Sequence, residues 1–449
     1  MATIERLDRY HFHEHDWETF EEIRDWFEWE VPDRFNIAAY VCDRWAEETP
    51  EQTALFVEDE SGATDTYTFA EFEAAASRLA NHLAASGVER GDRIGVNLPQ
   101  KPETAIAHVA AWKLGAVSVP LSTLFGPDGL GYRLADAGAS ACIVDGSNVD
   151  ALRRARDDYD LDLASVLVVD GQPEGDEQAY ADAVAGRDAE YEAVDTPAED
   201  DALLIYTSGT TGTPKGAELT HRNFLANVDQ CMRRFGPRPD KPADVPVVDE
   251  ESVTLSFLPL AHVFERLAGH FMMYAAGATV AYAESPDTLR EDFGLVRPST
   301  ATSVPRVYEK LYAAIREQAS ESSVKERIFN WATGVGREHH RADDPGVALR
   351  TRYAVADRLV FSTVKEALGG NVDFFISGGG SLSADLCELY HGMGVPILEG
   401  YGLTETAPVV AVNPPEEPKV GTIGPPVYDV EVRVDDDIGA VDSDGGEGG

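Results

Sequence analysis

One eleven-residue segment constrains the fold of this chain more than any other. Tyr206-Thr-Ser-Gly-Thr-Thr-Gly-Thr-Pro-Lys-Gly216 follows an apolar run, Ala202–Tyr206, that is typical of a buried strand. Glycines let backbone amides approach a polyphosphate, while hydroxyls add donors and a lysine adds a cation. A Walker loop is excluded, because there the lysine precedes Ser or Thr and opens a helix. Here Gly216 and the strand-like Ala217–Leu219 follow, and we expect the next helix near Thr220.

The segment therefore predicts a phosphate-binding loop behind a strand. The alternative is a polar Gly/Thr hairpin without a ligand, which four hydroxyls, three glycines and a late lysine make the weaker interpretation. The candidate phosphate-binding residues are Thr207, Ser208, Gly209, Thr210, Thr211, Gly212 and Lys215.

Helix and strand patterns alternate upstream of this loop. Thr68 and Glu71 form a capping box before a predicted helix, Phe69–Ala85, which Gly87 ends. Alternation of this kind predicts an α/β fold with a mostly parallel sheet covered on both faces. The further predicted elements are strands at Arg93–Leu98, Ala116–Leu121 and Ala141–Asp145 and a helix at Ala105–Leu114.

The pattern divides the chain into four predicted regions. These are an N-terminal extension (1–35), an α/β subdomain (36–200), a second α/β subdomain with the loop 206–216 (201–398), and the start of a β-rich subdomain (399–449). Residues 172–200 and 236–251 are expected to be exposed connections. Short strands such as Val427–Val434 are expected near the end, and because strand edges need partners, the chain is interpreted as truncated there.

The charge excludes one class of partner. The chain carries 37 Lys and Arg against 80 Asp and Glu, a net charge of −43 spread along its length. Such an excess repels itself unless salt screens it, which favours a halophilic protein from a salt-rich cytosol over one that binds a basic partner. Nucleic acid is excluded as a ligand, because binding to a phosphate backbone requires the opposite sign.

The remaining composition favours a soluble, cytoplasmic protein. Residues 1–26 show no basic segment followed by an apolar run, so no signal peptide is expected. The longest apolar stretch, Leu267–Ala283, is too short for a membrane span. The cysteines lie far apart and are expected to be reduced core thiols: Cys42, Cys142, Cys231 and Cys387.

The loop resembles the phosphate signature of the adenylate-forming (ANL) superfamily, the AMP-dependent synthetases and ligases. Three further segments match the superfamily in order: Leu258–Arg266, similar to its acyl-pocket segment; Ser377–Ser381, similar to its adenine-facing loop; and Tyr401–Thr406, similar to its nucleotide and magnesium motif, with Gly421–Gly424 after it. The resemblance extends from about residue 36 to 424. In 262–266 and 304–310 it is strongest to long-chain fatty acyl-CoA synthetases.

The resemblance implies the large lobe of such an enzyme: two doubly wound, mostly parallel α/β subdomains plus part of a small β-barrel subdomain. The family's small C-terminal lobe and its ribose-binding Asp have no counterpart before Gly449. A separate chain is one possible source of that lobe.

The resemblance also implies roles. A carboxylate attacks the α-phosphate of ATP and expels pyrophosphate, so charge neutralisation dominates catalysis. Glu405, with Thr207, would hold Mg²⁺, Thr404 would contact the α-phosphate, and His262 would border the acyl carboxylate. Lys215 completes the implied catalytic set. The implied nucleotide contacts are Gly378, Gly379, Gly380, Tyr401, Gly402 and Thr404.

The implied substrates are a long-chain fatty acid, ATP and CoA, with Mg²⁺. Two alternatives stay open: a ligase for an aryl or medium-chain acid, and a non-catalytic nucleotide- or acyl-binding remnant. Gly380-Ser381 replaces the Ala-Pro common in long-chain enzymes, which leaves chain length open. Glu265 and Arg266 are either a surface pair or a pocket wall. Membrane contact is expected to be peripheral at most.

Overall fold

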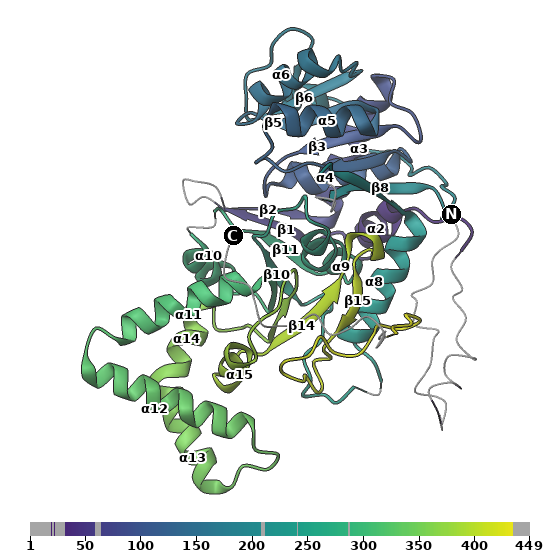
Figure 1. The fold of residues 1–449 in the computed structure, drawn as a ribbon. Helices are drawn as coiled ribbons and strands as arrows, with labels where there is room; N and C mark the ends of the chain where they lie inside the picture. The colour runs from purple at the N-terminus through teal and green to yellow at the C-terminus, as the bar shows by residue number, and fades with distance from the viewer. Residues whose placement is uncertain are drawn as a thin grey trace.

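The computed structural model describes residues 19, 22, 32–58, 64–207, 212–239, 241–285 and 288–433. Two sheets, stacked with helices between and around them, form the molecule (Figure 1). This arrangement confirms the predicted α/β fold with mostly parallel sheets.

The first sheet has seven strands in the order β7-β6-β5-β3-β4-β8-β9. All neighbours pair in parallel except β8 and β9, which form an antiparallel hairpin around the predicted phosphate loop. Its strands are β3 (Arg93–Asn97), β4 (Val117–Pro120), β5 (Ala139–Asp145), β6 (Ser165–Val169), β7 (Gln178–Ala179), β8 (Asp201–Thr207) and β9 (Lys215–Thr220).

The second sheet has eight strands in the order β15-β14-β13-β12-β10-β11-β1-β2. Its interior pairs are parallel, and the antiparallel strands β2 and β15 close the two edges. Its strands are β1 (Thr53–Glu58), β2 (Thr64–Thr68), β10 (Val253–Ser256), β11 (Thr279–Tyr282), β12 (Thr300–Ser303), β13 (Phe374–Ser377), β14 (Ile397–Gly402) and β15 (Val409–Val412).

Alternating side chains of the buried strands pack in different hydrophobic layers, because successive side chains of a strand point to opposite faces of the sheet. In β6, Val168 packs with the layer under α5 and α6, whereas Leu167 and Val169 join the layer between the sheets. A third layer separates the second sheet from α10–α15. The helices are η3 (Ala39–Asp43), α2 (Arg44–Glu48), α3 (Phe69–Ala85), α4 (Pro102–Lys113), α5 (Pro127–Ala137), α6 (Val149–Tyr159), α7 (Tyr180–Val184), α8 (His221–Phe235), η4 (Glu265–Phe271), α9 (Met272–Ala275), α10 (Leu289–Val296), α11 (Pro305–Ala319), α12 (Ser323–His340), α13 (Val347–Ala356), η5 (Asp357–Phe361), α14 (Ser362–Ala367), α15 (Ala384–Gly392) and η6 (Thr404–Thr406).

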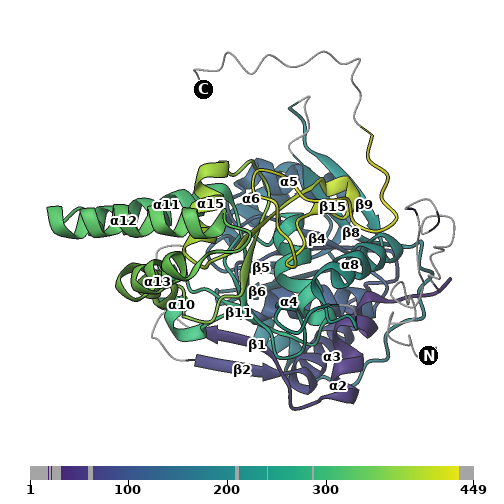
Figure 2. The ribbon, with the colours of Figure 1, turned by 90° about the horizontal axis from the view of Figure 1, so that it is seen from below.

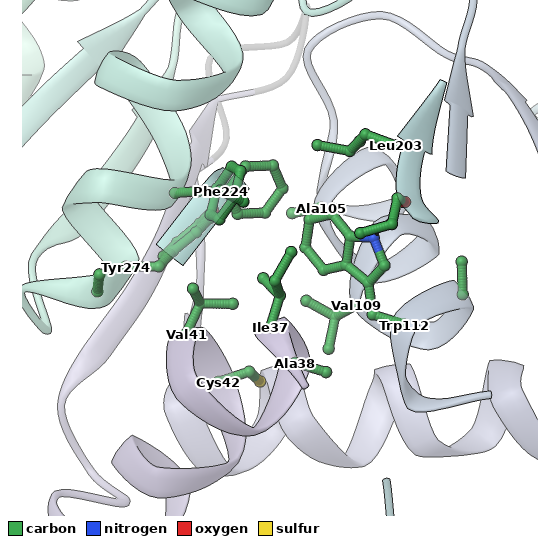
Figure 3. Close-up of a cluster of buried hydrophobic side chains, with 14 of the residues drawn as sticks. Ile37, Ala38, Val41, Cys42, Ala105, Val109, Trp112, Leu203, Phe224 and Tyr274 are labelled. Carbon is green, nitrogen blue, oxygen red and sulfur yellow. Dashed lines mark hydrogen bonds between the residues drawn. The ribbon is translucent and has the colours of Figure 1, made fainter. Parts of the chain in front are cut away.

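Aromatic packing joins the two sheets at the centre of the molecule. Trp112 of α4 is fully buried, and its indole Nε1 donates a hydrogen bond to the carbonyl oxygen of Ala202, 2.8 Å away (Figure 3). Its ring centroid lies 4.6 Å from that of Phe271, which in turn packs against Phe224. Because α4 connects β3 to β4 of the first sheet and Phe271 lies between β10 and β11 of the second, this contact fixes one sheet against the other.

The strands do not divide at the boundary predicted between residues 200 and 201. β1 and β2 belong to the second sheet, although they precede every strand of the first. β8 and β9 belong to the first sheet, although they follow that boundary. Pattern alone cannot assign a strand to a sheet, because the strands of both sheets are similar short apolar runs. The division of the chain into subdomains stays a prediction.

One local prediction holds only in part and another was wrong. Most of segment 172–200 is exposed or half-buried, but near its end Thr196 is fully buried and accepts a hydrogen bond from the Asn36 amide at 3.1 Å. Residues 427–433 of the predicted strand Val427–Val434 contain no strand, and only an isolated bridge joins Ala411 to Pro426. Pro425 and Pro426 lack the amide donors that a sheet ladder needs. Val434 lies outside the described residues.

Other predictions were confirmed. The capping box of Thr68 and Glu71 starts α3, which ends at Ala85 as expected. The four cysteines are free and buried. In the part of the chain that the structure describes, no helix is both long and apolar enough to cross a bilayer. Most of the extension 1–35 lies outside the described residues.

Candidate active site

A cavity of about 290 Å³ lies at the carboxyl ends of β8, β13 and β14. Ligands of open α/β sheets bind at this edge, because loops from several parallel strands converge there. The cavity brings together residues from four of the segments singled out in the sequence. Those in its wall are Thr207, His262, Gly378, Gly379, Tyr401, Gly402, Thr404 and Glu405.

Some candidate residues are not in this wall. Lys215 is exposed on β9, where it pairs in register with Thr207 of β8. Directly opposed residues of an antiparallel pair share one face of the sheet, so Lys215 lies beside the cavity rather than in it. Gly212 is exposed and has a φ of +83°. Gly380 comes directly after Gly379 in the sequence but does not line the cavity. Residues 208–211 lie outside the described part of the chain.

Close approach leaves little or no room for a side chain at two glycines. A Cβ atom at Gly378 would lie 3.1 Å from the Phe264 ring, which joins the 258–266 segment to the end of β13. At Gly402 a Cβ atom would lie 2.2 Å from the carbonyl oxygen of Pro408, within the β14–β15 hairpin. Any side chain at Gly402 would therefore push the hairpin apart and displace Thr404 and Glu405.

The turn that carries Glu405 is closed by its own side chains. Thr406 accepts a hydrogen bond from the Leu403 amide at 3.1 Å and donates to main-chain carbonyls of the same turn. Ala407 then reverses the chain with a φ of +64°, a conformation that non-glycine residues seldom adopt. Glu405 is consequently exposed at a fixed point on the cavity wall.

Buried polar residues of α8 hold this hairpin from behind, and sequence reasoning missed them. The Asn227 amide donates to the Val409 carbonyl and accepts from the Val409 amide, both at 2.9 Å. Arg234 donates to the carbonyl oxygens of Val412 and Pro426, both at 3.0 Å. The signal was present: residues 227 and 234 are seven apart, so they share the buried face of an amphipathic helix where polar residues need partners.

His262 is in the cavity wall, and one of its ring nitrogens is bound by the main chain. Its Nδ1 accepts a hydrogen bond from the Phe264 amide at 3.2 Å, so the proton of the neutral ring is placed on Nε2. Partial burial lowers the pKa of His262 below its ordinary value. A neutral imidazole with a free Nε2–H can therefore donate to an anionic ligand at neutral pH.

Glu265 and Arg266 are not a surface pair, and neither residue lines the cavity. Both are fully buried on the π-helical turn η4. Burial raises the pKa of Glu265 to about 7 and lowers the pKa of Arg266 to about 9. Glu265 accepts a hydrogen bond from Thr302 of β12, and Arg266 donates to the Leu260 carbonyl. The pair thus fastens the segment that carries His262 to the second sheet.

The residues present fit a magnesium ion held with a nucleotide. Among the described residues, no three His, Cys, Asp or Glu side chains group as a metal cluster. Mg²⁺ needs no such cluster, since it binds through one or two carboxylates, waters and substrate phosphates. The Glu405 carboxylate and the Thr207 hydroxyl are both in the cavity wall and supply suitable oxygen ligands.

Comparison with known sequences identifies relatives over most of the chain. The profile of the family described as AMP-binding enzyme matches residues 42–449. A long-chain-fatty-acid–CoA ligase of Mycobacterium bovis, FadD15, is 33% identical over 361 residues, which cover 79% of this chain and 58% of the relative. Long chain acyl-CoA synthetase 3 of Arabidopsis thaliana is 28% identical and is also covered to 58%. The chain therefore spans a little over half the length of these curated relatives.

Solved structures share the fold. The anthranilate CoA ligase AuaEII, in complex with anthranoyl-AMP, superposes with a TM-score of 0.71 at 20% identity, covering 91% of this chain and 68% of that protein. At this identity the likeness concerns the fold alone, which is the mixed α/β arrangement of the large N-terminal lobe of adenylate-forming enzymes.

Proposed function

Because the chain belongs to the family of AMP-binding enzymes, we propose that it binds ATP and activates a carboxylic acid as its acyl-adenylate. The observation that carries the proposal is the cavity, where residues of the phosphate loop, the 258–266 segment and the 401–406 motif meet in one wall. Three segments far apart in sequence have no structural reason to present polar groups at one point. A shared ligand supplies that reason.

The proposed reaction joins two anions, so the residues act mainly by position and charge. One carboxylate oxygen of the acid forms a bond to the α-phosphorus, and the bond from that phosphorus to the pyrophosphate oxygen breaks. Glu405 and Thr207 would hold Mg²⁺, which supplies positive charge to the phosphates. Thr404 would donate to the α-phosphate and His262 to the acid, while Tyr401, which is 48% exposed, would cover the adenine.

Long-chain fatty acids are the acid class that we propose. The cavity wall also contains apolar side chains suited to an acyl chain: Cys231, Phe235, Ala268, Met272, Ile376 and Val412. The curated relatives named above support the same class. An aryl acid is the second candidate, because a cavity of about 290 Å³ is small for a ligand site. The third candidate is a binding remnant that no longer turns over.

Transfer of the acyl group to CoA would follow in the complete enzyme. We propose that this step needs residues beyond those of this lobe, since the matched region covers only 58% of the relative's length. A separate chain that supplies a C-terminal lobe remains part of this proposal. We also propose a cytoplasmic, salt-adapted setting, which the net charge of −43 supports.

The test is acid-dependent exchange of pyrophosphate with ATP, measured with Mg²⁺ in multimolar KCl. Palmitate, octanoate and benzoate are compared on the wild-type chain, Glu405→Ala and Glu417→Ala. Glu417 is an exposed carboxylate outside the cavity wall and is the matched control. We expect palmitate-dependent exchange that Glu405→Ala abolishes and Glu417→Ala retains. Exchange only with benzoate would replace the acid class. Folded protein without exchange would mean that adenylation needs a further lobe or that this chain only binds.

A further inference from the structure

One part of the chain departs from its acidic character. Residues 305–368 contain eleven Lys and Arg against nine Asp and Glu, a net charge of +2 in a chain of net −43. This segment forms α11, α12, α13, η5 and α14. We call it the arm. Outside the arm the charge is accordingly −45.

The arm projects from the sheets. In Figure 1, α12 and α13 lie at the lower left, away from both sheets, and in the view from below α11 and α12 again extend beyond the rest of the molecule (Figure 2). Nearly all of α12 before Phe329 is exposed, and contact with α13 and α15 begins further along it. The end of the arm is therefore free to meet another surface.

Apolar side chains are exposed at helical spacing on the arm. On α12 these are Val324, Ile328 and Trp331, which are 55%, 36% and 39% exposed and lie four and three residues apart. Residues so spaced share one face of a helix. On α13 and η5, Val347, Val355 and Leu359 are 81%, 46% and 55% exposed, at spacings of eight and four. Each helix thus presents an apolar stripe to solvent.

Basic side chains flank these stripes. On a helix of 100° per residue, Arg327 lies about 60° from the centre of the α12 stripe, so its charge stands at the stripe's edge. Arg358 precedes Leu359 in the same way, and both arginines are exposed. An apolar face edged by arginine or lysine is typical of helices that lie in a lipid interface, where the charges meet anionic headgroups.

We propose that the arm docks this protein on a lipid bilayer that carries anionic headgroups. The charge distribution favours this occupant, because an acidic body is repelled from such a surface and the arm is the part of the chain that is not acidic. The arm also holds that body at a distance, which matters over the range of the Debye length. Neither argument depends on the proposed reaction, although a long-chain acid would be supplied from the same bilayer.

A protein partner fits the arm less well. Stable protein interfaces centre on a packed apolar patch from which charged residues are depleted. The arm instead offers two separated stripes, which a fluid lipid surface accommodates without a matching shape. Docking of the arm on the acidic body of a second copy is the main alternative, and the experiment below separates it.

The test is co-sedimentation of the whole chain with vesicles of phosphatidylcholine and phosphatidylglycerol in 0.15 M KCl, where the Debye length is about 8 Å, and again in 1 M KCl, where it is about 3 Å. The arm variant replaces Val324, Ile328 and Trp331 together by Gln, all at exposed positions. Leu124→Gln is the matched control, because Leu124 is 88% exposed on the body of the protein. We expect the arm variant to bind at least tenfold more weakly and the control to bind as the wild type does. Circular dichroism verifies the helix content of each.

A second measurement locates the contact. Vesicles with brominated acyl chains quench tryptophans that enter the lipid, so wild-type fluorescence should fall and Trp331→Phe should remove most of that fall. Absent vesicle binding, or equal binding by the arm variant, would overturn the proposal. A change in oligomeric mass on light scattering, without vesicle binding, would assign the arm to a second copy. Pyrophosphate exchange in the soluble arm variant keeps failure here distinct from failure of the proposed reaction.

Discussion

Replacement of Asn227 by Ala tests whether α8 holds the hairpin that carries Glu405. Asn227 is 3% exposed, and its amide makes two hydrogen bonds of 2.9 Å to the main chain of Val409. Alanine removes both, together with the 2.9 Å bond that the same amide donates to Gln230, and leaves the Val409 donor and acceptor without their partner. An orphaned buried polar group costs about 1–3 kcal/mol. Since Val409 is half-buried and water can reach part of it, we expect a total loss of about 2–4 kcal/mol.

The loss should be local. Because each 1.4 kcal/mol is a factor of ten, opening of the β14–β15 hairpin should become about 30- to 900-fold more frequent. Amide hydrogen exchange of the peptide containing Val409–Val412 measures this directly, with β12 (Thr300–Ser303) as an internal reference that should not change. The KM for ATP should rise with it, because Tyr401 and Glu405 are in the same hairpin and turn.

Asn371→Ala is the matched control. Asn371 also makes a pair of hydrogen bonds, to Arg297 at 3.2 and 3.3 Å, but on the surface. Because water can replace these bonds, we expect Asn371→Ala to lower the stability by less than about 0.5 kcal/mol. If the opening free energy of β15, measured by amide exchange, stays within about 0.5 kcal/mol of wild type in Asn227→Ala, α8 does not hold the hairpin in this way. Equal losses of that free energy in Asn227→Ala and Asn371→Ala would refute the reasoning as well.

Three further predictions concern the scaffold. Trp112→Ala should cost about 3–5 kcal/mol in chemical denaturation, because it leaves a cavity between the sheets; a loss below 1 kcal/mol would contradict that packing. Thr68→Ala should cost about 0.5–2 kcal/mol by removing the capping box of α3, and Thr68→Ser should restore most of it. Burial raises the pKa of Glu265 from 4.5 to about 7, so its contribution to stability should fall by about 3 kcal/mol as the pH rises through that range. Urea unfolding at pH 5 and pH 8 should show this fall in the wild type and not in Glu265→Gln.

Much of the fold could be predicted from local sequence. The apolar runs, the capping box and the glycine stops placed each of the elements predicted before residue 220 to within a few residues. The cavity also gathers most of the motif residues that the sequence singled out, from Thr207 to Glu405. These predictions of elements and motifs were possible because each depends on residues within a few positions along the chain.

The features that could not be predicted depend on distant contacts. Nothing local assigns Leu55 and the hairpin of β1 and β2 to a sheet whose remaining strands begin at residue 253. The buried state of Glu265 likewise comes from β10 and β12, which pack against η4 from other parts of the chain. Asn227 looked like an ordinary helical residue because its partner, Val409, is 182 positions away.

The order of strands in the two sheets has a consequence for synthesis at the ribosome. The first sheet is complete once residue 220 has been made, so it can form while the chain is still growing. β1, with the fully buried Leu55, must wait for its parallel neighbour β11, which ends at Tyr282. At about 5–20 residues per second, roughly 10–45 s separate the two strands. Throughout that interval the nascent hairpin of β1 and β2 presents one unpaired edge, and a ribosome-associated chaperone that binds extended apolar segments would find its target there.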